Sequence, residues 1–332
     1  MTTIYDVAAR AGVSAATVSR VLNGGGTVSP ALAERVQAAV QELSYRPNGV
    51  ARNLRRRATT VWGLIISDIG NPFFTAIVRG VEDAAHDAGF SLVLCNSDDV
   101  LDKEQGYIQI ALAEQMAGVI ITPASEAESD LSLLLERGIP VVAVDRRLGR
   151  HDVDTVVGDN VRGARLAIEH LLESGCRRIA CITGPTQTTT AQERLEGYRQ
   201  AITTAGLKVD PSLIMIENFK EDGGYEGAER LLRLDTPPDG MFVANNLMTV
   251  GALEALMDAG VEIPRDLLLV GFDDIPWARL TRPRLTTVAQ PTYEMGHEAG
   301  RLLAARLSSD PGLARTVILS PTLQVRESSR RD

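Results

Sequence analysis

A short segment near the N-terminus combines side chains that suit contacts with DNA base edges. Methyl groups pack against the C5-methyl of thymine, hydroxyls hydrogen-bond to several bases, and an arginine can bond guanine through two atoms. These side chains fall at the N-terminal end and on the outer face of one predicted helix, and they are Ala15, Ala16, Thr17, Ser19 and Arg20. The pattern predicts a helix that reads the major groove. A helical hairpin without a ligand is the alternative.

A second set of candidate residues follows predicted strands in the rest of the chain. A sugar needs flat apolar surfaces for its C–H faces and planar donors and acceptors for its hydroxyls. The aromatic candidates are Phe73, Phe74 and Phe219, and the polar candidates are Asn71, Asp145, Arg146, Asn245, Asp273 and Gln290. Ligands of open α/β sheets bind outside the carboxyl ends of the strands, so we expect these residues to share one cleft.

Several of these positions have a purely structural alternative. Phe74 can belong to a hydrophobic core, and Asn246 can cap the helix that begins there. Asp274 is adjacent to Asp273 and is expected to brace a loop, because neighbouring side chains at a strand end point apart. The run Thr188-Thr189-Thr190 is interpreted as a solvated loop.

The candidate DNA-reading helix is the second of three predicted helices. The first carries an apolar stripe at Ile4, Val7, Ala8 and Ala11, with Thr3 as its cap. Gly12 can adopt the left-handed conformation that ends a helix, and Ser14 can cap the next one, whose apolar residues are Val18, Val21 and Leu22. A third helix is predicted over 31–43, with Ser29 as its cap and Pro30 at its first position. This is the pattern of a helix-turn-helix unit.

From Val61 onward, short apolar runs alternate with helical patterns. The predicted strands are VWGLII, SLVLCN, GVIIT, PVVAV, RIACIT, LIMIE, GMFVAN and LLLVGF, and the predicted helices include 73–88, 163–174, 190–205, 224–234 and 246–259. Strands rich in Val, Ile and Leu between helices indicate parallel sheets covered on both faces. There are too many strands for one sheet of ordinary size, which predicts more than one α/β unit.

The N-terminal motifs resemble the headpiece of the lac repressor family of bacterial transcription regulators. The matching runs are Tyr5-Asp6-Val7-Ala8, Ala11-Gly12-Val13-Ser14, residues 17–23, Val28-Ser29-Pro30, Tyr45-Arg46-Pro47-Asn48 and residues 50–54. The likeness then covers the core to the last strand, so it spans nearly the whole chain. It implies a helix-turn-helix headpiece at 1–46, a hinge at 47–58 and an effector-binding core at 59–332.

The resemblance also implies the architecture of the core. Periplasmic sugar-binding proteins share this core, which implies two doubly wound parallel-sheet lobes: an N-lobe of about 59–160 and 290–320, and a C-lobe of about 161–289 and 321–332. The candidate cleft residues are similar to those of ribose-type members, and Arg194 matches a cleft arginine of the family. One departure is Asn245-Asn246, where the family usually has Asn-Asp.

The same resemblance implies the DNA contacts and the assembly. The hinge would pair with its twin in the minor groove, with Leu54 as an apolar wedge between base steps. A basic disordered linker is a compatible alternative in the free protein. The expected DNA-binding residues are Thr3, Tyr5, Ser14, Ala15, Ala16, Thr17, Ser19, Arg20, Asn23, Asn48, Val50, Ala51, Arg52, Leu54 and Arg55. No apolar heptad follows the strand TLQVRE, so we expect a homodimer on a near-palindromic operator.

Charge distribution agrees with DNA binding by one end of the chain. Residues 1–57 hold eight arginines and three acidic residues, a net of +5, whereas the remainder holds 26 basic and 40 acidic residues, a net of −14. The three cysteines are expected to be buried free thiols, and the four scattered histidines predict no metal site. Neither a signal peptide nor a membrane span is predicted, which suggests a cytoplasmic protein.

The competing functions differ in the motifs they require. Phosphate-binding loops, nucleophile elbows and HExxH motifs do not occur in the sequence, so we expect neither an enzyme nor a cofactor. A secreted sugar-binding protein would lack the basic headpiece. The expected function is therefore an effector-controlled repressor, with a free ribose-like sugar as the effector. A purine or a phosphorylated partner protein is the alternative effector within the same class.

Overall fold

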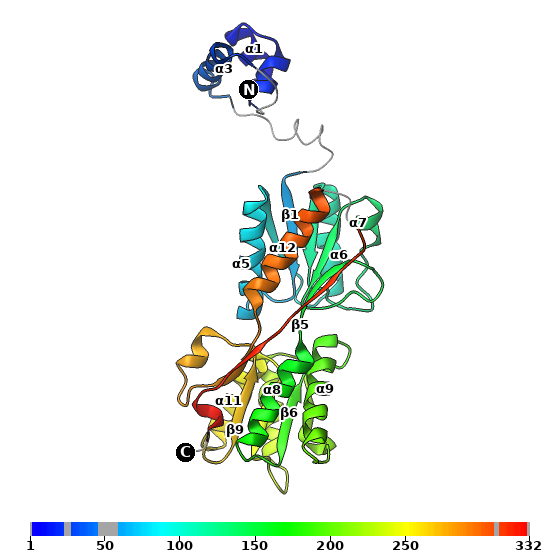
Figure 1. Ribbon diagram of the computed structural model, residues 1–332, viewed down its shortest axis with the longest axis vertical. Coiled ribbons are helices and arrows are strands. Elements are labelled where there is room, and N and C mark those ends of the chain that lie inside the picture. The colour runs from blue at the N-terminus through cyan, green and yellow to red at the C-terminus, as the bar shows by residue number, and fades with distance from the viewer. Residues whose placement is uncertain (1, 23–27, 46–58, 309–311, 331–332) are drawn as a thin grey trace. The chain divides into compact units, whose positions relative to one another are not determined.

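The computed structural model describes residues 2–22, 28–45, 59–308 and 312–330. The chain forms two compact units, which divide at residue 58. The headpiece unit contains α1 (Ile4–Ala11), α2 (Ala15–Leu22) and α3 (Pro30–Glu42). The core unit contains two six-stranded sheets with their covering helices (Figure 1).

Local signals at the predicted positions set the ends of α1 and the start of α2, whereas Ser29 occupies the N-cap position of α3 without a side-chain capping bond. Thr3 caps α1 in a reciprocal capping box: its hydroxyl accepts from the Asp6 amide at 3.3 Å, and its own amide donates to the Asp6 carboxylate at 2.7 Å. Gly12 ends the helix with φ +65°, where glycine avoids the steric penalty of a Cβ. Ser14 Oγ accepts from the Thr17 amide at 3.2 Å, which caps α2.

The headpiece core is small and draws on all three helices. Val7, Val18 and Val36 are fully buried at its centre. Arg35 donates from Nη2 to the carbonyl of Ala11, which gives one unpaired carbonyl at the end of α1 a partner.

The first lobe of the core is built on the sheet β11-β5-β4-β3-β1-β2, in which every pair is parallel. Its strands are β1 (Val61–Ile66), β2 (Ser91–Asn96), β3 (Gly118–Ile121), β4 (Val141–Val144), β5 (Asp154–Gly158) and β11 (Thr316–Leu319). Its helices are α5 (Pro72–Asp87), α6 (Leu101–Ala113), α7 (Ser132–Glu136) and α12 (Thr292–Ser308). β2 is an edge strand.

The second lobe is built on the sheet β12-β10-β9-β8-β6-β7. Its strands are β6 (Ile179–Thr183), β7 (Ile214–Ile216), β8 (Gly240–Val243), β9 (Leu268–Phe272), β10 (Thr286–Ala289) and β12 (Thr322–Gln324). Its helices are α8 (Asn160–Glu173), α9 (Thr189–Thr204), α10 (Glu221–Leu232) and α11 (Asn246–Asp258), with short 3-10 turns at Pro211–Leu213, Pro276–Arg279 and Glu327–Ser329. The edge strand β12 runs antiparallel to β10.

The chain passes between the two sheets three times. It leaves the first after β5, returns between β10 and α12, and crosses again between β11 and β12, which Figure 1 shows as the long red segment. Each lobe therefore contains segments from distant parts of the sequence. The cleft side chains come from the carboxyl ends of both sheets.

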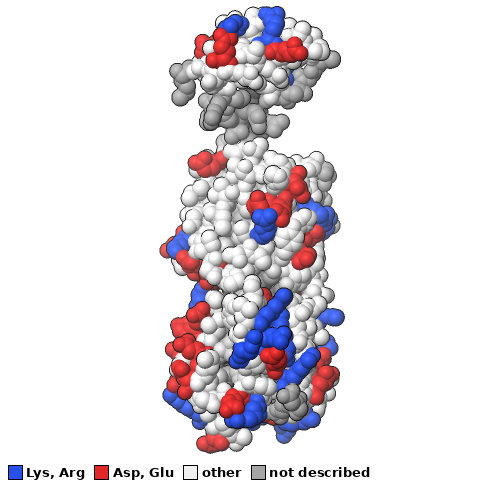
Figure 2. All heavy atoms as spheres, turned by 90° about the vertical axis from the view of Figure 1, so that its left-hand side faces the viewer, with Lys and Arg blue, Asp and Glu red and all other residues white. Residues whose placement is uncertain are grey.

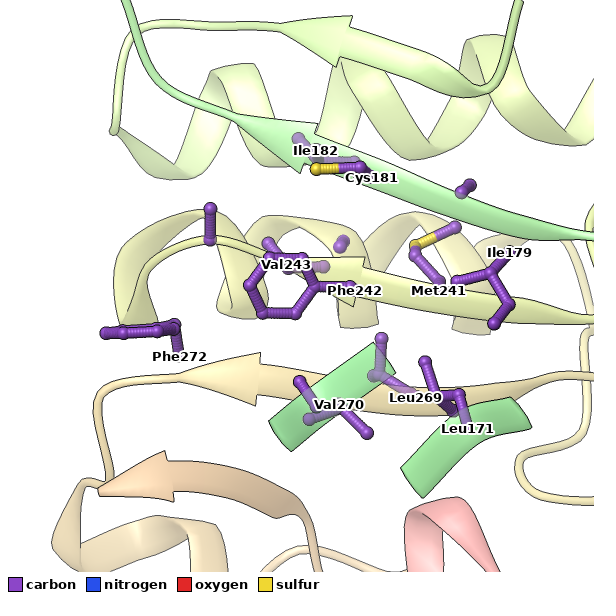
Figure 3. Packing of buried hydrophobic residues seen from close by; sticks show 14 of the residues in the cluster. Leu171, Ile179, Cys181, Ile182, Met241, Phe242, Val243, Leu269, Val270 and Phe272 are labelled. Carbon is purple, nitrogen blue, oxygen red and sulfur yellow. The ribbon is translucent and has the colours of Figure 1, made fainter. Parts of the chain in front are cut away.

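Near-continuous apolar strands form the core of each lobe, as expected for sheets covered on both faces. In Figure 3, Phe242 from β8 lies between the neighbouring strands, and Leu171 from α8 packs beside Leu269. The rings of Phe242 and Phe272 meet edge to face at 6.2 Å. Burial of each such side chain contributes about 1.5–3 kcal/mol to folding.

The burial of the three cysteines agrees only partly with expectation. Cys176 and Cys181 are buried thiols, but Cys95 on the edge strand β2 is only half-buried. None of the helices in the described residues is long and apolar enough to cross a membrane.

Candidate functional site

The headpiece exposes several of the side chains that were predicted to contact DNA. Tyr5 on α1 is 74% exposed, and Ala16 and Arg20 on α2 are exposed. Ser14 and Thr17 also bond to each other, with 2.9 Å between their hydroxyl oxygens. These two side chains therefore hold the start of α2, in addition to any contact they make with DNA.

Part of the predicted DNA-binding set lies outside the described residues. This part consists of Asn23, Asn48, Val50, Ala51, Arg52, Leu54 and Arg55. Their assignment remains a prediction from the sequence.

A cavity in the core is lined by nine of the ten predicted effector-binding residues. Its empty volume, including its opening to solvent, is about 470 Å³. The predicted residues that line it are Asn71, Phe73, Phe74, Asp145, Arg146, Arg194, Phe219, Asn245 and Asp273. Asn71, Asp145 and Arg146 come from the first lobe, whereas Arg194 and Asp273 come from the second.

Gln290 lies beside this cavity and acts on it indirectly. Its Nε2 donates to Asp273 Oδ1 at 2.7 Å, and it lines a neighbouring hollow that also includes Phe73. Gln290 therefore orients a cavity carboxylate from the crossing segment after β10.

Both polar atoms of the Asn245 side chain form hydrogen bonds within the protein. Its Oδ1 accepts from the Met248 amide at 2.8 Å, which caps α11, and its Nδ2 donates to the Phe219 carbonyl at 2.9 Å. Asn245, and not Asn246, is thus the helix cap. Asn246 donates to Asn71 Oδ1 at 2.7 Å, across the cleft.

Asp145 and Arg146 form the buried polar end of the first lobe's wall, at 6% and 7% exposure. Burial raises the pKa of Asp145 to about 6, against the opposing attraction of Arg146 and Arg194. Burial alone would lower the pKa of Arg146, but Asp99 and Asp145 together raise it. The Nε of Arg146 is buried without a hydrogen-bond partner in the described part of the chain, so it can donate to a ligand oxygen.

Arg194 connects three parts of the second lobe. It donates to Asn160 Oδ1 at 2.8 Å and to the Ala244 carbonyl at 2.6 Å. Its guanidinium also lies over the Phe272 ring, 3.9 Å from the centroid, and 3.7 Å from Asp273. Burial raises the pKa of Asp273, although Arg194 and the hydrogen bond from Gln290 oppose the effect.

Three cavity residues have left-handed backbone conformations. They are Asp145, Phe219 and Asp273, with φ of +70°, +62° and +71°. Each costs about 1–3 kcal/mol for a residue other than glycine, and such strain gathers at functional sites. Gly184 makes room for the aromatic wall, because a Cβ there would lie 2.2 Å from the Phe219 ring.

Phe73 and Phe74 belong both to the cavity wall and to the core. Both are at least 90% buried within the first lobe's hydrophobic cluster, and their rings meet edge to face at 5.1 Å. The two readings of Phe74 are therefore compatible. Asp274 braces the C-terminal segment as predicted, because it accepts from Arg326 and from the Thr287 hydroxyl.

One expectation near the start of α9 is wrong. Thr189 begins the helix, and Thr190 is buried against the cavity, so this run is not a solvated loop. Three residues further along α9, Glu193 accepts from Asn160 at 3.0 Å and pairs with Arg147 at 3.8 Å.

Five lining residues were not predicted. They are Asp68, Asp99, Thr190, Lys220 and Leu247. Asp68 lies in the polar stretch directly after β1, and strand-end position was a usable signal there. Asp99, Lys220 and Leu247 likewise lie two or three residues after predicted strands, so the same signal applied to them, whereas Thr190 lies within α9.

Comparison with known proteins matches both units. Residues 3–48 match the model of bacterial regulatory proteins of the lacI family, and residues 168–329 match a periplasmic binding protein-like domain. The chain is 39% identical to a ribose operon repressor from Halalkalibacterium halodurans, over 99% of this chain and 98% of that protein.

Solved structures agree with this assignment. The transcriptional regulator CelR in complex with cellobiose has 36% sequence identity and a TM-score of 0.75, covering 99% of this chain and 100% of that one. The lac repressor dimer bound to operator and the anti-inducer ONPF has 26% identity and a TM-score of 0.88, with 99% coverage of both chains. With a helix-turn-helix headpiece, a two-lobed core and these relatives, the chain belongs to the lacI family of bacterial regulatory proteins and is a DNA-binding transcription regulator, not an enzyme.

Proposed function

We propose that this regulator is a homodimeric repressor controlled by a free pentose or hexose, ribose-like by preference, bound between the lobes of its core. The observation that carries the proposal is the pairing of the cavity cations. Arg146 is paired with Asp99 at 2.6 Å, Arg194 lies 3.7 Å from Asp273, and Lys220 is paired with Asp68 at 2.7 Å.

The charge balance favours a neutral ligand over a phosphorylated one. Three cations and four carboxylates line the cavity, whereas a bound phosphate requires cations or helix N-termini that are not already neutralised. Phe73, Phe74 and Phe219 offer apolar surface to a sugar ring, and Asp145 and the Nε of Arg146 offer an acceptor and a donor for adjacent hydroxyls. The ribose and cellobiose in the names of two relatives are in keeping with a sugar.

The homodimer is supported by apolar surface on the first lobe. The edge strand β2 exposes Val93 and Leu94 at 40% and 37%, and Val100 and Ile110 beside it are 43% and 47% exposed. On the face that Figure 2 shows, charged residues are sparser on this lobe than on the other lobe. An unpaired edge with apolar side chains suits pairing with a second copy. Sedimentation at micromolar concentration tests this, and a monomer would contradict it.

On DNA, the dimer would place two α2 helices in successive major grooves, about 34–36 Å apart. The basic headpiece supplies the phosphate affinity, and the acidic core stays off the DNA.

Calorimetry with a panel of ligands tests the effector. D-ribose, other pentoses and hexoses, a phosphosugar and a purine base are titrated into the full-length protein. Binding of one free sugar is expected, with loss of that binding in Asp145→Ala and in Asp273→Ala and no change in the control Asp235→Ala, which is exposed. Operator affinity of both cavity variants without sugar should stay near that of the unaltered protein. Tight binding of the purine or the phosphosugar, with no heat from any sugar, would exclude this effector class.

A further inference from the structure

The N-terminus of α9 lacks a cap from its own sequence. Thr188 occupies the N-cap position with an extended backbone, but its side chain does not cap the helix. Its hydroxyl donates instead to the Pro185 carbonyl at 2.9 Å. The first amides of a helix have no acceptor within the helix, and the Thr189 amide bonds to a group from elsewhere.

That group is the Glu126 carboxylate, which belongs to the other lobe. Glu126 lies in the loop after β3, and its Oε1 accepts from the Thr189 amide at 2.6 Å and from the Thr189 hydroxyl at 2.8 Å. A carboxylate at a helix N-terminus is also favoured by the helix dipole. A second contact between the lobes, Arg147 with Glu193, lies one turn further along α9.

The loop that carries Glu126 is tied to the cavity wall of the first lobe. Arg146 donates from Nη1 to the Pro123 carbonyl at 3.1 Å, and the Glu126 carbonyl accepts from the Gly149 amide at 2.8 Å. Two bonds therefore join this loop to the segment after β4 that carries Arg146.

Helix α9 forms part of the cavity wall on the side of the second lobe. Thr190 and Arg194 are both 4% exposed and both line the cavity. The bond between Glu126 and Thr189 thus links the loop beside Arg146 to the helix that carries Arg194. Glu126 itself is half-buried and is not part of the cavity lining.

We propose that Glu126 is a positioning residue that caps α9 from across the cleft and thereby stabilises the closed arrangement of the lobes. The cap exists only when the lobes are together, so its free energy adds to the closed state alone. A ligand that requires the closed state binds more weakly when that state is less populated. The effect on sugar affinity rests on the proposed function, whereas the cap itself does not.

The cap is tested first without any ligand. Amide hydrogen exchange is measured in the full-length protein and in Glu126→Ala, Glu126→Gln and Glu128→Ala. Glu128 is an exposed acid in the same loop and serves as the matched control. Peptides covering the start of α9 should exchange about fivefold faster in Glu126→Ala, since a cap is worth on the order of 1 kcal/mol. Glu126→Gln keeps an acceptor oxygen and should restore much of the protection. Unchanged protection in Glu126→Ala would overturn the proposal.

Sugar affinity then separates a positioning role from a merely structural one. With D-ribose as the first probe, Glu126→Ala should raise Kd about fivefold, Glu126→Gln should raise it less, and Glu128→Ala should not change it. Faster exchange with an unchanged Kd would show that the cap stabilises α9 but does not position the site. If the unaltered protein bound no sugar, the proposed effector would be wrong, and the exchange experiment would still decide the cap.

Discussion

Arg146 donates to both carboxylate oxygens of Asp99, from Nη1 at 2.6 Å and from Nη2 at 3.4 Å. Both residues line the cavity, and 47 positions separate them in the chain. The pair occupies the two terminal nitrogens of the guanidinium and leaves the buried Nε without a hydrogen-bond partner among the described residues, 3.9 Å from Asp145 Oδ2. The direction of this donor is therefore set by a residue that the sequence did not single out.

Replacing Asp99 should weaken sugar binding. Asp99→Ala removes the main partner of a buried cation, and a hydrogen bond to a charged group is worth about 1.5–3 kcal/mol, so Kd should rise at least about tenfold. Asp99→Asn keeps an acceptor and should cost less. Calorimetry measures both. The neighbouring Asp98, which pairs with Lys103, provides the control: an equal loss in Asp98→Ala would indicate a general disturbance of the loop.

Sugar affinity should fall as the pH is lowered through about 6. Burial raises the pKa of Asp145 from 3.8 to about 6, and a sugar hydroxyl donates best to the ionised carboxylate. Titrations between about pH 5 and about pH 7.5 test this. In Asp145→Asn the pH dependence in this range should disappear along with most of the affinity. A flat profile for the unaltered protein would mean that Asp145 does not accept from the ligand in its ionised form.

The buried carboxyl of Asp145 should make the sugar-free protein less stable at neutral pH. Its pKa is higher in the folded than in the unfolded chain, so its contribution to stability is greatest below pH 3.8 and is lost as the pH rises to about 6. The difference between 3.8 and about 6 corresponds to about 3 kcal/mol. Asp145→Asn should therefore raise the free energy of unfolding near pH 7 by up to about 3 kcal/mol, measured by urea denaturation. A loss of stability would contradict this.

Asn246→Asp should disfavour contact between the lobes. The side-chain Nδ2 of Asn246 donates to Asn71 Oδ1 at 2.7 Å, and the same oxygen accepts from the backbone amide of Phe73 at 3.0 Å. A carboxylate at 246 would face an oxygen that cannot turn away without breaking the cap of α5. We expect about tenfold weaker sugar binding, because a buried acceptor without a donor costs about 1–3 kcal/mol. Asn246→Ala removes the donor without adding an oxygen and should lose less. Equal losses would show that repulsion plays no part.

Arg20→Ala should reduce specific DNA binding much more than non-specific binding. A bidentate bond to guanine discriminates against other bases by about 1–3 kcal/mol. Gel shifts at fixed salt with operator and with unrelated DNA measure the two affinities. If both fell equally, Arg20 would contact phosphate and not a base.

Leu54→Ala should reduce operator affinity and DNA bending but leave the core dimer and its effector binding unchanged. Leu54 lies outside the described residues, so this prediction rests on the sequence and the family resemblance. An apolar wedge stabilises an unstacked base step, and its removal makes the bend more costly. Unchanged mobility in a circular-permutation assay would exclude this role.

Local features of the sequence were sufficient for the headpiece. Gly12 and Ser14 mark the end of one helix and the start of the next, and the apolar stripe around Val7 and Val18 identifies the buried faces. These signals act within a few residues along the chain, which is why they are readable without a tertiary structure. The strands of the core were equally readable, because strands buried on both faces are continuously apolar.

β5 is a strand that such patterns fail to predict. It begins with Asp154, a residue depleted in strands, and the sequence pattern does not predict it. In the structure Asp154 is fully buried and accepts from Arg306 of α12 at 2.7 and 3.0 Å. A charge is tolerated there only because a distant partner neutralises it.

The sequence by itself determined the family, the fold class and most of the side chains that line the cavity, since strand-end position and residue type are local properties. Only the tertiary structure decided how those side chains are used. The pairs Arg146 with Asp99, Thr189 with Glu126 and Asn246 with Asn71 join residues 47, 63 and 175 positions apart. Hydrogen bonds require atoms to meet within about 3 Å. Which donors are occupied and which stay available to a ligand therefore depends on the fold of each lobe and on how the two lobes come together.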